Sequence, residues 1–154
     1  MSEEKSEKTV GSEVSLGHLA TDISFVTRVL RAQLLEQTGD FFEKHGVASG
    51  QVALLNLIAL NPGVSQKELA EAVVLKKSAL TKAINELERN GLIERRKSGG
   101  DQRYNALHLS EQGLARVAAM RTDMLGLQDT ILGVLSDAER AQLFDMIWRV
   151  IRSR

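Results

Sequence analysis

The segment from Ser65 to Leu109 constrains the fold most, because the spacing of its apolar residues changes at Gly91. Before Gly91 the apolar residues recur every three or four positions, which is typical of amphipathic helices. After Gly91, Leu107 and Leu109 alternate with polar residues, which is typical of a strand. The segment therefore predicts helices followed by a β-hairpin.

Two short helices are expected before Gly91. Ser65 and Glu68 form a capping box, in which each side chain accepts the backbone N–H of the other residue, and this predicts a short helix to about Ala72. A second amphipathic helix is expected over 76–90, because glycine is favoured just after a helix C-terminus. Two short helices joined by an apolar link without glycine or proline match the helix-turn-helix pattern.

A β-hairpin is expected directly after the second helix. Its strands are predicted over 92–97 and 103–109, and the loop 98–102 between them contains two glycines that allow positive φ. Basic residues lie on both strands. Helix, turn, helix and basic hairpin in this order predict a winged helix-turn-helix lobe.

The second predicted helix has two distinct faces. Leu80, Ile84 and Leu87 recur at helical spacing and are expected to face the core. The opposite, polar face carries no carboxylate and is formed by Ser78, Thr81, Lys82 and Asn85. Such a face suits a DNA major groove, where donors and small groups meet base edges and carboxylates would repel phosphates. An ordinary solvated helix face is the alternative.

The formal net charge of zero hides an uneven distribution along the chain. The 20 Lys and Arg residues balance 20 Asp and Glu residues overall. Residues 76–103 carry eight basic and four acidic side chains, whereas residues 1–50 carry five and eight. A local excess of positive charge is expected where a protein contacts phosphates, and chance clustering on a solvated surface is the alternative.

The rest of the chain predicts longer helices. Apolar spacing predicts one over 16–45, which is long for a chain of this size and suggests a partner or a second copy of itself. Ser49 is expected to cap a helix that is apolar on most sides and therefore central to the fold. Two further helices are expected, one over 110–132 and one that begins with a capping box at Ser136.

The sequence shows no motif for cysteine chemistry, a metal site or catalysis. The absence of cysteine excludes disulfides, cysteine-ligated zinc, iron–sulfur clusters and thiol nucleophiles, and is compatible with a cytoplasmic location. His18, His45 and His108 lack metal-ligand spacing and are expected to be exposed or hydrogen-bonded within the fold. We expect no enzyme activity, no metal and no cofactor.

No membrane segment is expected. No apolar run approaches the roughly 20 residues that a membrane span needs. Residues 1–14 are rich in Ser, Glu and Lys without an apolar segment, which predicts a disordered tail rather than a signal peptide.

The order of elements and several motifs resemble the MarR family of bacterial transcription regulators. The matching motifs are SQKELA over 65–70, KKSALTK over 76–82, LERNGLI over 87–93, and a wing signature made of Asp101-Gln102-Arg103, Leu107-His108-Leu109-Ser110 and Gly113. The resemblance extends over about residues 16–152, nearly the whole predicted folded chain.

The resemblance implies a mainly α fold with a small β-hairpin wing. It implies one domain over 15–154, in which residues 15–48 and 110–154 form dimerisation helices and residues 49–109 form a winged helix-turn-helix DNA-binding lobe. It further implies a cytoplasmic homodimer that binds a pseudo-palindromic operator in double-stranded DNA, and a role as a ligand-responsive repressor. The alternative is a winged-helix protein–protein interaction module without a specific operator.

The resemblance also implies that Arg103 enters a minor groove and that Asp101 holds it by an ion pair. Arginine suits this role because its planar guanidinium is always charged. The expected DNA-binding residues are Lys76, Lys77, Ser78, Thr81, Lys82, Asn85, Arg95, Arg96, Lys97, Asp101 and Arg103. Most of the cations are expected on phosphates, whereas Ser78, Thr81 and Asn85 are expected near base edges.

Relatives commonly respond to a small aromatic or anionic effector, so an effector of unknown identity is expected here. Arg28 and Arg31 on the first helix are candidates to meet a carboxylate. Intersubunit ion pairs or plain solvation are the commoner roles for such residues. The absence of cysteine excludes the thiol-switch type of peroxide sensing.

Overall fold

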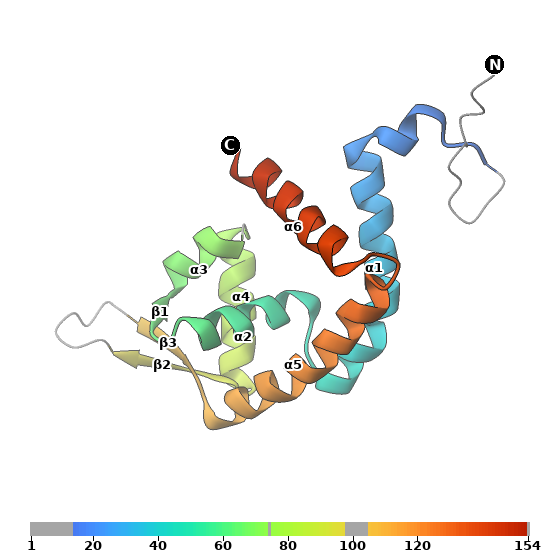
Figure 1. The fold of residues 1–154 in the computed structure, drawn as a ribbon. Coiled ribbons are helices and arrows are strands. Elements are labelled where there is room, and N and C mark those ends of the chain that lie inside the picture. The colour runs from blue at the N-terminus through green and yellow to red at the C-terminus, as the bar shows by residue number, and fades with distance from the viewer. Residues whose placement is uncertain (1–13, 74, 98–104, 154) are drawn as a thin grey trace, which may run out of the picture. The chain divides into compact units, whose positions relative to one another are not determined.

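The structure is a computed structural model that describes residues 14–73, 75–97 and 105–153. The elements in chain order are η1 (Gly17–Thr21), α1 (Ile23–His45), α2 (Ser49–Leu60), β1 (Val64–Ser65), α3 (Gln66–Val73), α4 (Lys77–Arg89), β2 (Ile93–Lys97), β3 (Asn105–Leu109), α5 (Glu111–Ile131) and α6 (Asp137–Arg152) (Figure 1). They fall into two compact units, one up to Gly39 and one from Asp40 onward. The predicted disordered tail lies outside the described residues, apart from Val14.

The first long helix begins later than the apolar spacing predicts. The turn over Gly17–Thr21 is a 3-10 helix, and α1 itself begins at Ile23. Asp22 has an extended conformation, and its side chain accepts the backbone N–H of Phe25 at 2.7 Å, as a helix N-cap does. The predicted start was wrong because the apolar spacing continues through the 3-10 turn.

The cap of α2 also differs from the prediction. Gly46 ends α1 with a φ of 59°, as predicted, but Ser49 is the first helical residue of α2 and not its cap. The N-cap is Ala48, whose backbone N–H donates to Gln51 Oε1 at 3.0 Å. The glutamine side chain thus satisfies one of the amides at this terminus, so a capping serine is not needed.

The hairpin is part of a three-stranded antiparallel sheet with the order β1-β3-β2. The predicted hairpin of β2 and β3 is confirmed, with Ile93 opposite Leu109. The unpredicted strand β1 pairs with the other edge of β3, where Val64 lies opposite Leu107. A strand of two residues is too short to show a period in the sequence, so this strand was missed.

The core confirms the central position expected for the apolar helix. Helix α2 contacts α3, α4, α5 and β3 (Figure 1). Its fully buried side chains are Leu54, Leu55 and Ile58. Leu80, Ile84 and Leu87 of α4 are buried in the same cluster, as predicted. Because this stripe of α4 points into the core, the opposite stripe is left at the surface.

Gly113 in the first turn of α5 packs directly on the backbone that enters the sheet. A Cβ atom at this position would lie 2.0 Å from the carbonyl oxygen of Leu92. The same oxygen accepts the backbone N–H of Ser110, whose side chain caps α5. The close approach therefore requires a residue without a side chain.

We expect Gly113→Ala to lower the free energy of unfolding by about 3 kcal/mol, because backbone atoms must move to admit the methyl group. Gly126→Ala is the matched control in the same helix, since a Cβ there would meet nothing within 4 Å. The control should be neutral or stabilising by up to about 1 kcal/mol. Urea denaturation at one protein concentration measures both, and equal stabilities would refute this account of Gly113.

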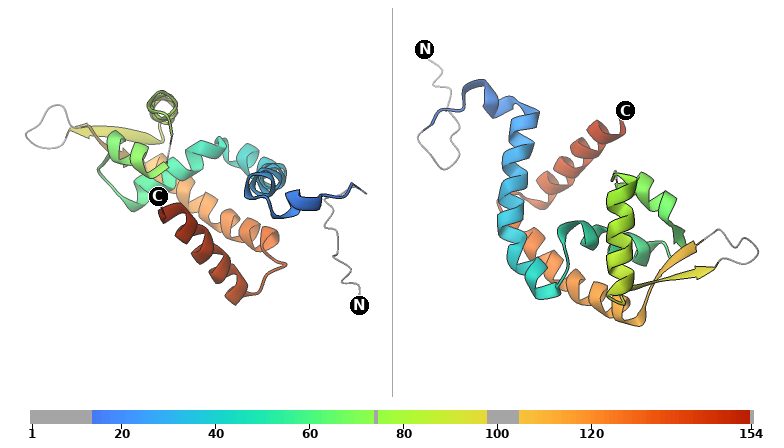
Figure 2. Two further views of the ribbon diagram at one scale, coloured as in Figure 1. Left: turned by 90° about the horizontal axis from the view of Figure 1, so that it is seen from above. Right: turned by 180° about the vertical axis from the view of Figure 1, so that it is seen from behind.

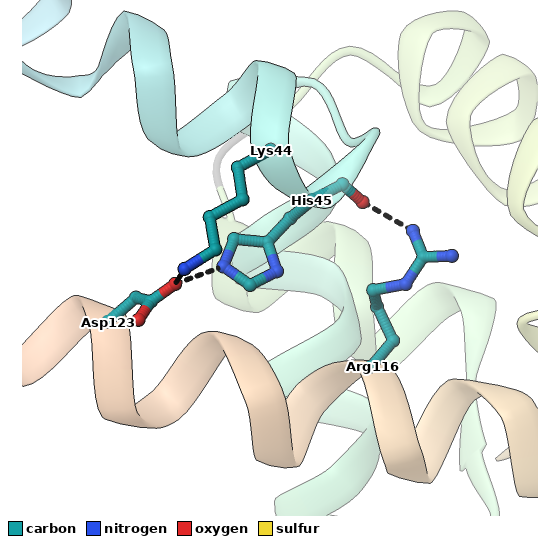
Figure 3. Close-up of polar contacts among 4 residues, drawn as sticks. All are labelled: Lys44, His45, Arg116 and Asp123. Carbon is teal, nitrogen blue, oxygen red and sulfur yellow. Dashed lines mark hydrogen bonds and ion pairs between the residues drawn. The ribbon is translucent and has the colours of Figure 1, made fainter.

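The last turn of α1 is joined to α5 by a small polar cluster (Figure 3). Asp123 Oδ2 lies 2.6 Å from Lys44 Nζ and 2.8 Å from His45 Nε2. Arg116 donates to the backbone carbonyl of His45. His45 is buried and hydrogen-bonded, which confirms that it is a satisfied histidine within the fold. The hydrogen bonds from Lys44 and from His45 lower the pKa of Asp123 below its ordinary value of 3.8.

A carboxyl group whose pKa is lower in the folded state than in the unfolded state stabilises the fold only at pH values at which the group is ionised. We therefore expect Asp123→Asn to destabilise the protein most above pH 3.8, and the difference from wild type to shrink as the pH falls through the lower folded pKa of Asp123. Urea denaturation between neutral and acidic pH measures this difference. Asp145→Asn on α6 is the control, because Asp145 Oδ2 makes only a long ion pair of 4.0 Å, with Arg149 Nη1, among the described residues. A difference that stays constant with pH would show that ionised Asp123 is not the cause.

Helix α6 begins at the predicted capping box and buries none of its residues. The Ser136 side chain accepts the N–H of Glu139, and Glu139 accepts the N–H of Ser136. Helix α6 also carries several large apolar side chains that are exposed. Four of them lie on one side of the helix, which we name the apolar α6 face: Phe144, Ile147, Trp148 and Ile151. A contiguous exposed apolar patch of this kind marks an interaction surface.

None of the helices in the described residues is both long and apolar enough to cross a membrane.

Candidate nucleic-acid interface

Helix α4 presents one polar side to solvent because its apolar stripe is buried. The helix follows Lys76, whose extended backbone makes it the N-cap, although its side chain makes no capping hydrogen bond. No acidic residue lies in the first turn. Gly91 ends this segment with a φ of 72°, and Leu92 N–H donates to the carbonyl of Leu87, so the chain turns into β2.

Five of the predicted DNA-binding residues line one shallow depression along the exposed side of α4. We name this surface the α4 polar face, and it consists of Lys77, Ser78, Thr81, Lys82, Asn85 and Arg89. Arg89 was not predicted, although its position four residues after Asn85 places it on the same helical face. The face therefore carries three cations and no carboxylate.

The cations of the α4 polar face are available to a ligand. The ion pairs found in the described part of the chain use none of Lys77, Lys82 and Arg89. The two acidic residues of α4 that precede Arg89 are occupied elsewhere. Glu86 accepts from Gln51 Nε2 at 3.3 Å, and Glu88 pairs with Arg95. The face is thus locally positive in a chain of zero net charge.

Thr81 uses its hydroxyl group inside the lobe. Its Oγ1 donates to the carbonyl of Lys77 at 2.9 Å and accepts from Gln66 Nε2 at 2.8 Å. Gln66 is the first residue of α3, so this contact ties the two helices of the helix-turn-helix together. The Thr81 hydroxyl has no remaining proton to donate, and its methyl group remains for apolar contact.

Asn85 and Arg95 contact each other, although the sequence predicted a separate role for each. Arg95 Nη2 donates to Asn85 Oδ1 at 2.7 Å. Arg95 Nε lies 3.1 Å from Glu88 Oε2, as an ion pair without well-aligned hydrogen-bond geometry. The guanidinium of β2 is therefore held by α4 instead of being free for a phosphate.

The other predicted wing residues differ in their surroundings. Arg96 Nη2 lies 2.5 Å from Glu94 Oε1, and both side chains are largely exposed. Lys97 is exposed at the last position of β2, opposite Asn105, the first residue of β3. The two paired strands lie side by side in both views of Figure 2. Asp101 and Arg103 lie outside the described residues, so their predicted ion pair and groove contact remain predictions.

Within the described residues no three His, Cys, Asp or Glu side chains come together as metal ligands. The site is instead an open surface of cations, hydroxyls and one amide. Such groups bind anions and hydrogen-bond acceptors, and they provide no nucleophile or general base in an enclosed cavity.

The known proteins to which this chain is similar are transcriptional regulators. A family model described as "MarR family" matches residues 45–103. A transcriptional regulatory protein for the hcr operon of Thauera aromatica is 36% identical over 107 residues, which cover 70% of this chain and 64% of that protein. The regulator BilQ of Clostridium symbiosum is 25% identical over 131 residues, which cover 85% of this chain and 91% of that protein. The chain spans 64% of the length of the Thauera protein, and likewise 64% of the length of the regulator YdgJ of Bacillus subtilis, to which it is 27% identical over 105 residues.

Solved structures show the same fold. The transcriptional repressor CouR, bound to a 23-mer DNA duplex, superposes with a TM-score of 0.84 at 23% identity, over 92% of this chain and 100% of that chain. The PcaV transcriptional regulator of Streptomyces coelicolor, in complex with its natural ligand, superposes with a TM-score of 0.79 at 26% identity. The superposition covers 92% of this chain and 98% of that chain.

Proposed function

The chain belongs to the MarR family, and from this premise we propose that it is a sequence-specific regulator of transcription that binds double-stranded DNA through the α4 polar face. The observation that carries the proposal is that the exposed side of α4 combines three cations with small polar side chains and carries no carboxylate. Cations neutralise phosphates, and small polar groups reach base edges in a major groove.

The start of α4 supports the same proposal. Lys76 and Lys77 stand where the helix dipole favours negative charge, and no acidic residue lies in the first turn. This arrangement is unfavourable in the free protein. A phosphate at the helix N-terminus would meet both the lysines and unpaired backbone N–H groups, so DNA would offset the cost.

We propose a homodimer as the DNA-binding form. The apolar α6 face is exposed in the single chain, and a second copy would cover it by two-fold symmetry. In this organisation residues 15–48 and 110–154 are the dimerisation regions, and residues 49–109 are the DNA-binding lobe. A two-fold dimer presents two α4 helices, so we propose a pseudo-palindromic operator.

The regulatory role is proposed from the relatives. CouR is a repressor, and PcaV was solved with its natural ligand. We propose that this chain likewise represses transcription in the cytoplasm and is released from DNA by a small aromatic or anionic effector. Arg28 and Arg31 of α1 are exposed and are candidate partners for such an anion.

The proposal is tested by selecting DNA fragments from the host genome and measuring their binding in gel shifts at two salt concentrations. We expect fragments that share an inverted repeat, bound tightly at low salt and more weakly at high salt, because phosphate contacts release counterions. Candidate metabolites are then added to the complex, and an effector should release the DNA. A protein that enriches no sequence would instead be a protein–protein interaction module.

A further inference from the structure

Arg95 of the wing strand is held between two side chains of α4. Its Nη2 donates to Asn85 Oδ1 at 2.7 Å, and its Nε lies 3.1 Å from Glu88 Oε2. Only 26% of the Arg95 side chain is exposed. Asn85 and Glu88 are three positions apart and thus share one side of the helix. The guanidinium therefore connects β2 to α4 at the edge of the α4 polar face.

This contact determines which way the amide of Asn85 faces. A guanidinium carries five donors and no acceptor, so the amide atom that faces Arg95 must be the oxygen. The amide nitrogen then points away from Arg95. Asn85 also lines the depression of the α4 polar face. An occupant of that depression would then meet the N–H groups of the Asn85 amide.

We propose that Arg95 makes Asn85 a donor-only reader of bases. An amide that recognises adenine presents its oxygen and its NH2 side by side to adenine N6 and N7. Because its oxygen accepts from Arg95 and is turned toward it, Asn85 would present its N–H donors to the bases, and these suit guanine N7 and O6 or thymine O4. The preferred base at one position of each half-site is therefore guanine or thymine. This inference rests on the proposed function, and it makes Arg95 a positioning residue rather than a phosphate contact.

Selection of binding sites from a random double-stranded DNA library tests the inference. Wild-type protein should prefer guanine or thymine over adenine by about tenfold at one position of each half-site. Asn85→Asp keeps an oxygen for Arg95 and removes both N–H donors. It should fold like wild type and lose this preference. Arg95→Met frees the amide to turn, and adenine should then be accepted at the same position.

Arg96→Met is the matched control, because it removes the same charge from the next residue of β2. It should weaken binding to all sequences by similar factors and leave the base preference unchanged. Circular dichroism and thermal melting establish that each variant is folded. Should Arg95→Met keep the wild-type preference, or Asn85→Asp alter no position, the inference is wrong while the proposed function stands. If wild-type protein selects no sequence, the proposed function itself fails and the inference falls with it.

Discussion

Lys82→Glu is expected to weaken binding to the selected DNA by at least about a hundredfold without unfolding the protein. Lys82 is exposed at the centre of the α4 polar face, and the described residues give it no ion-pair partner. Each phosphate that a lysine neutralises contributes about tenfold to affinity near 0.1 M salt, and a dimer carries two such contacts. The glutamate adds repulsion, so the loss exceeds the product of the two contacts.

Fluorescence anisotropy titrations at several salt concentrations measure this loss. The slope of the logarithm of the affinity against the logarithm of salt should fall in magnitude by about two for the dimer. Arg121→Glu on α5 is the control, because it makes the same change of charge on an exposed residue outside the α4 polar face. Equal affinities for the two variants would remove Lys82 from the interface.

Ile147→Asp is expected to dissociate the proposed dimer at micromolar concentration. Ile147 lies on the apolar α6 face and is 42% exposed in the single chain. In a two-fold dimer the Ile147 side chains of both protomers are buried at the interface, and each contributes about 2 kcal/mol to association. The dissociation constant should therefore rise by at least about a thousandfold, and more if the buried carboxylate finds no partner.

Sedimentation equilibrium measures the association, and DNA titration should show a parallel loss of affinity because a monomer presents only one α4. Val134→Asp is the control, since Val134 is 90% exposed in the turn between α5 and α6. It should leave the dimer intact. An Ile147→Asp variant that remains dimeric would show that the chains associate through another surface.

The sequence predicted those parts of the fold that depend on local chemistry. The capping boxes at Ser65 and Ser136 and the glycine that ends α4 mark helix boundaries within a few residues, and the structure confirms them. The start of α1 was predicted wrongly because the apolar spacing passes through the 3-10 turn before Asp22. Strand β1 was missed because it exists only through its pairing with β3.

In the candidate site, too, the sequence predicts features that lie within one helix but not the contacts between different elements. Helical spacing identifies which side of α4 is exposed and polar, and continued by one turn it would have included Arg89. Spacing does not reveal the contacts of Asn85 with Arg95 or of Thr81 with Gln66. These pairs join different elements, so they depend on how the elements pack and on the rotamers that packing allows.

The measurement that tests the central claim most directly is a hydroxyl-radical footprint of the wild-type protein on its selected DNA. A dimer that inserts two α4 helices into successive major grooves predicts two protected segments of the DNA backbone, related by two-fold symmetry and centred about one helical turn, or about 10 base pairs, apart. Protection should vanish with Lys82→Glu and persist with Arg121→Glu. A single unsymmetrical protected segment, or no protection at concentrations where the protein is dimeric, would contradict the proposal that paired α4 helices bind DNA.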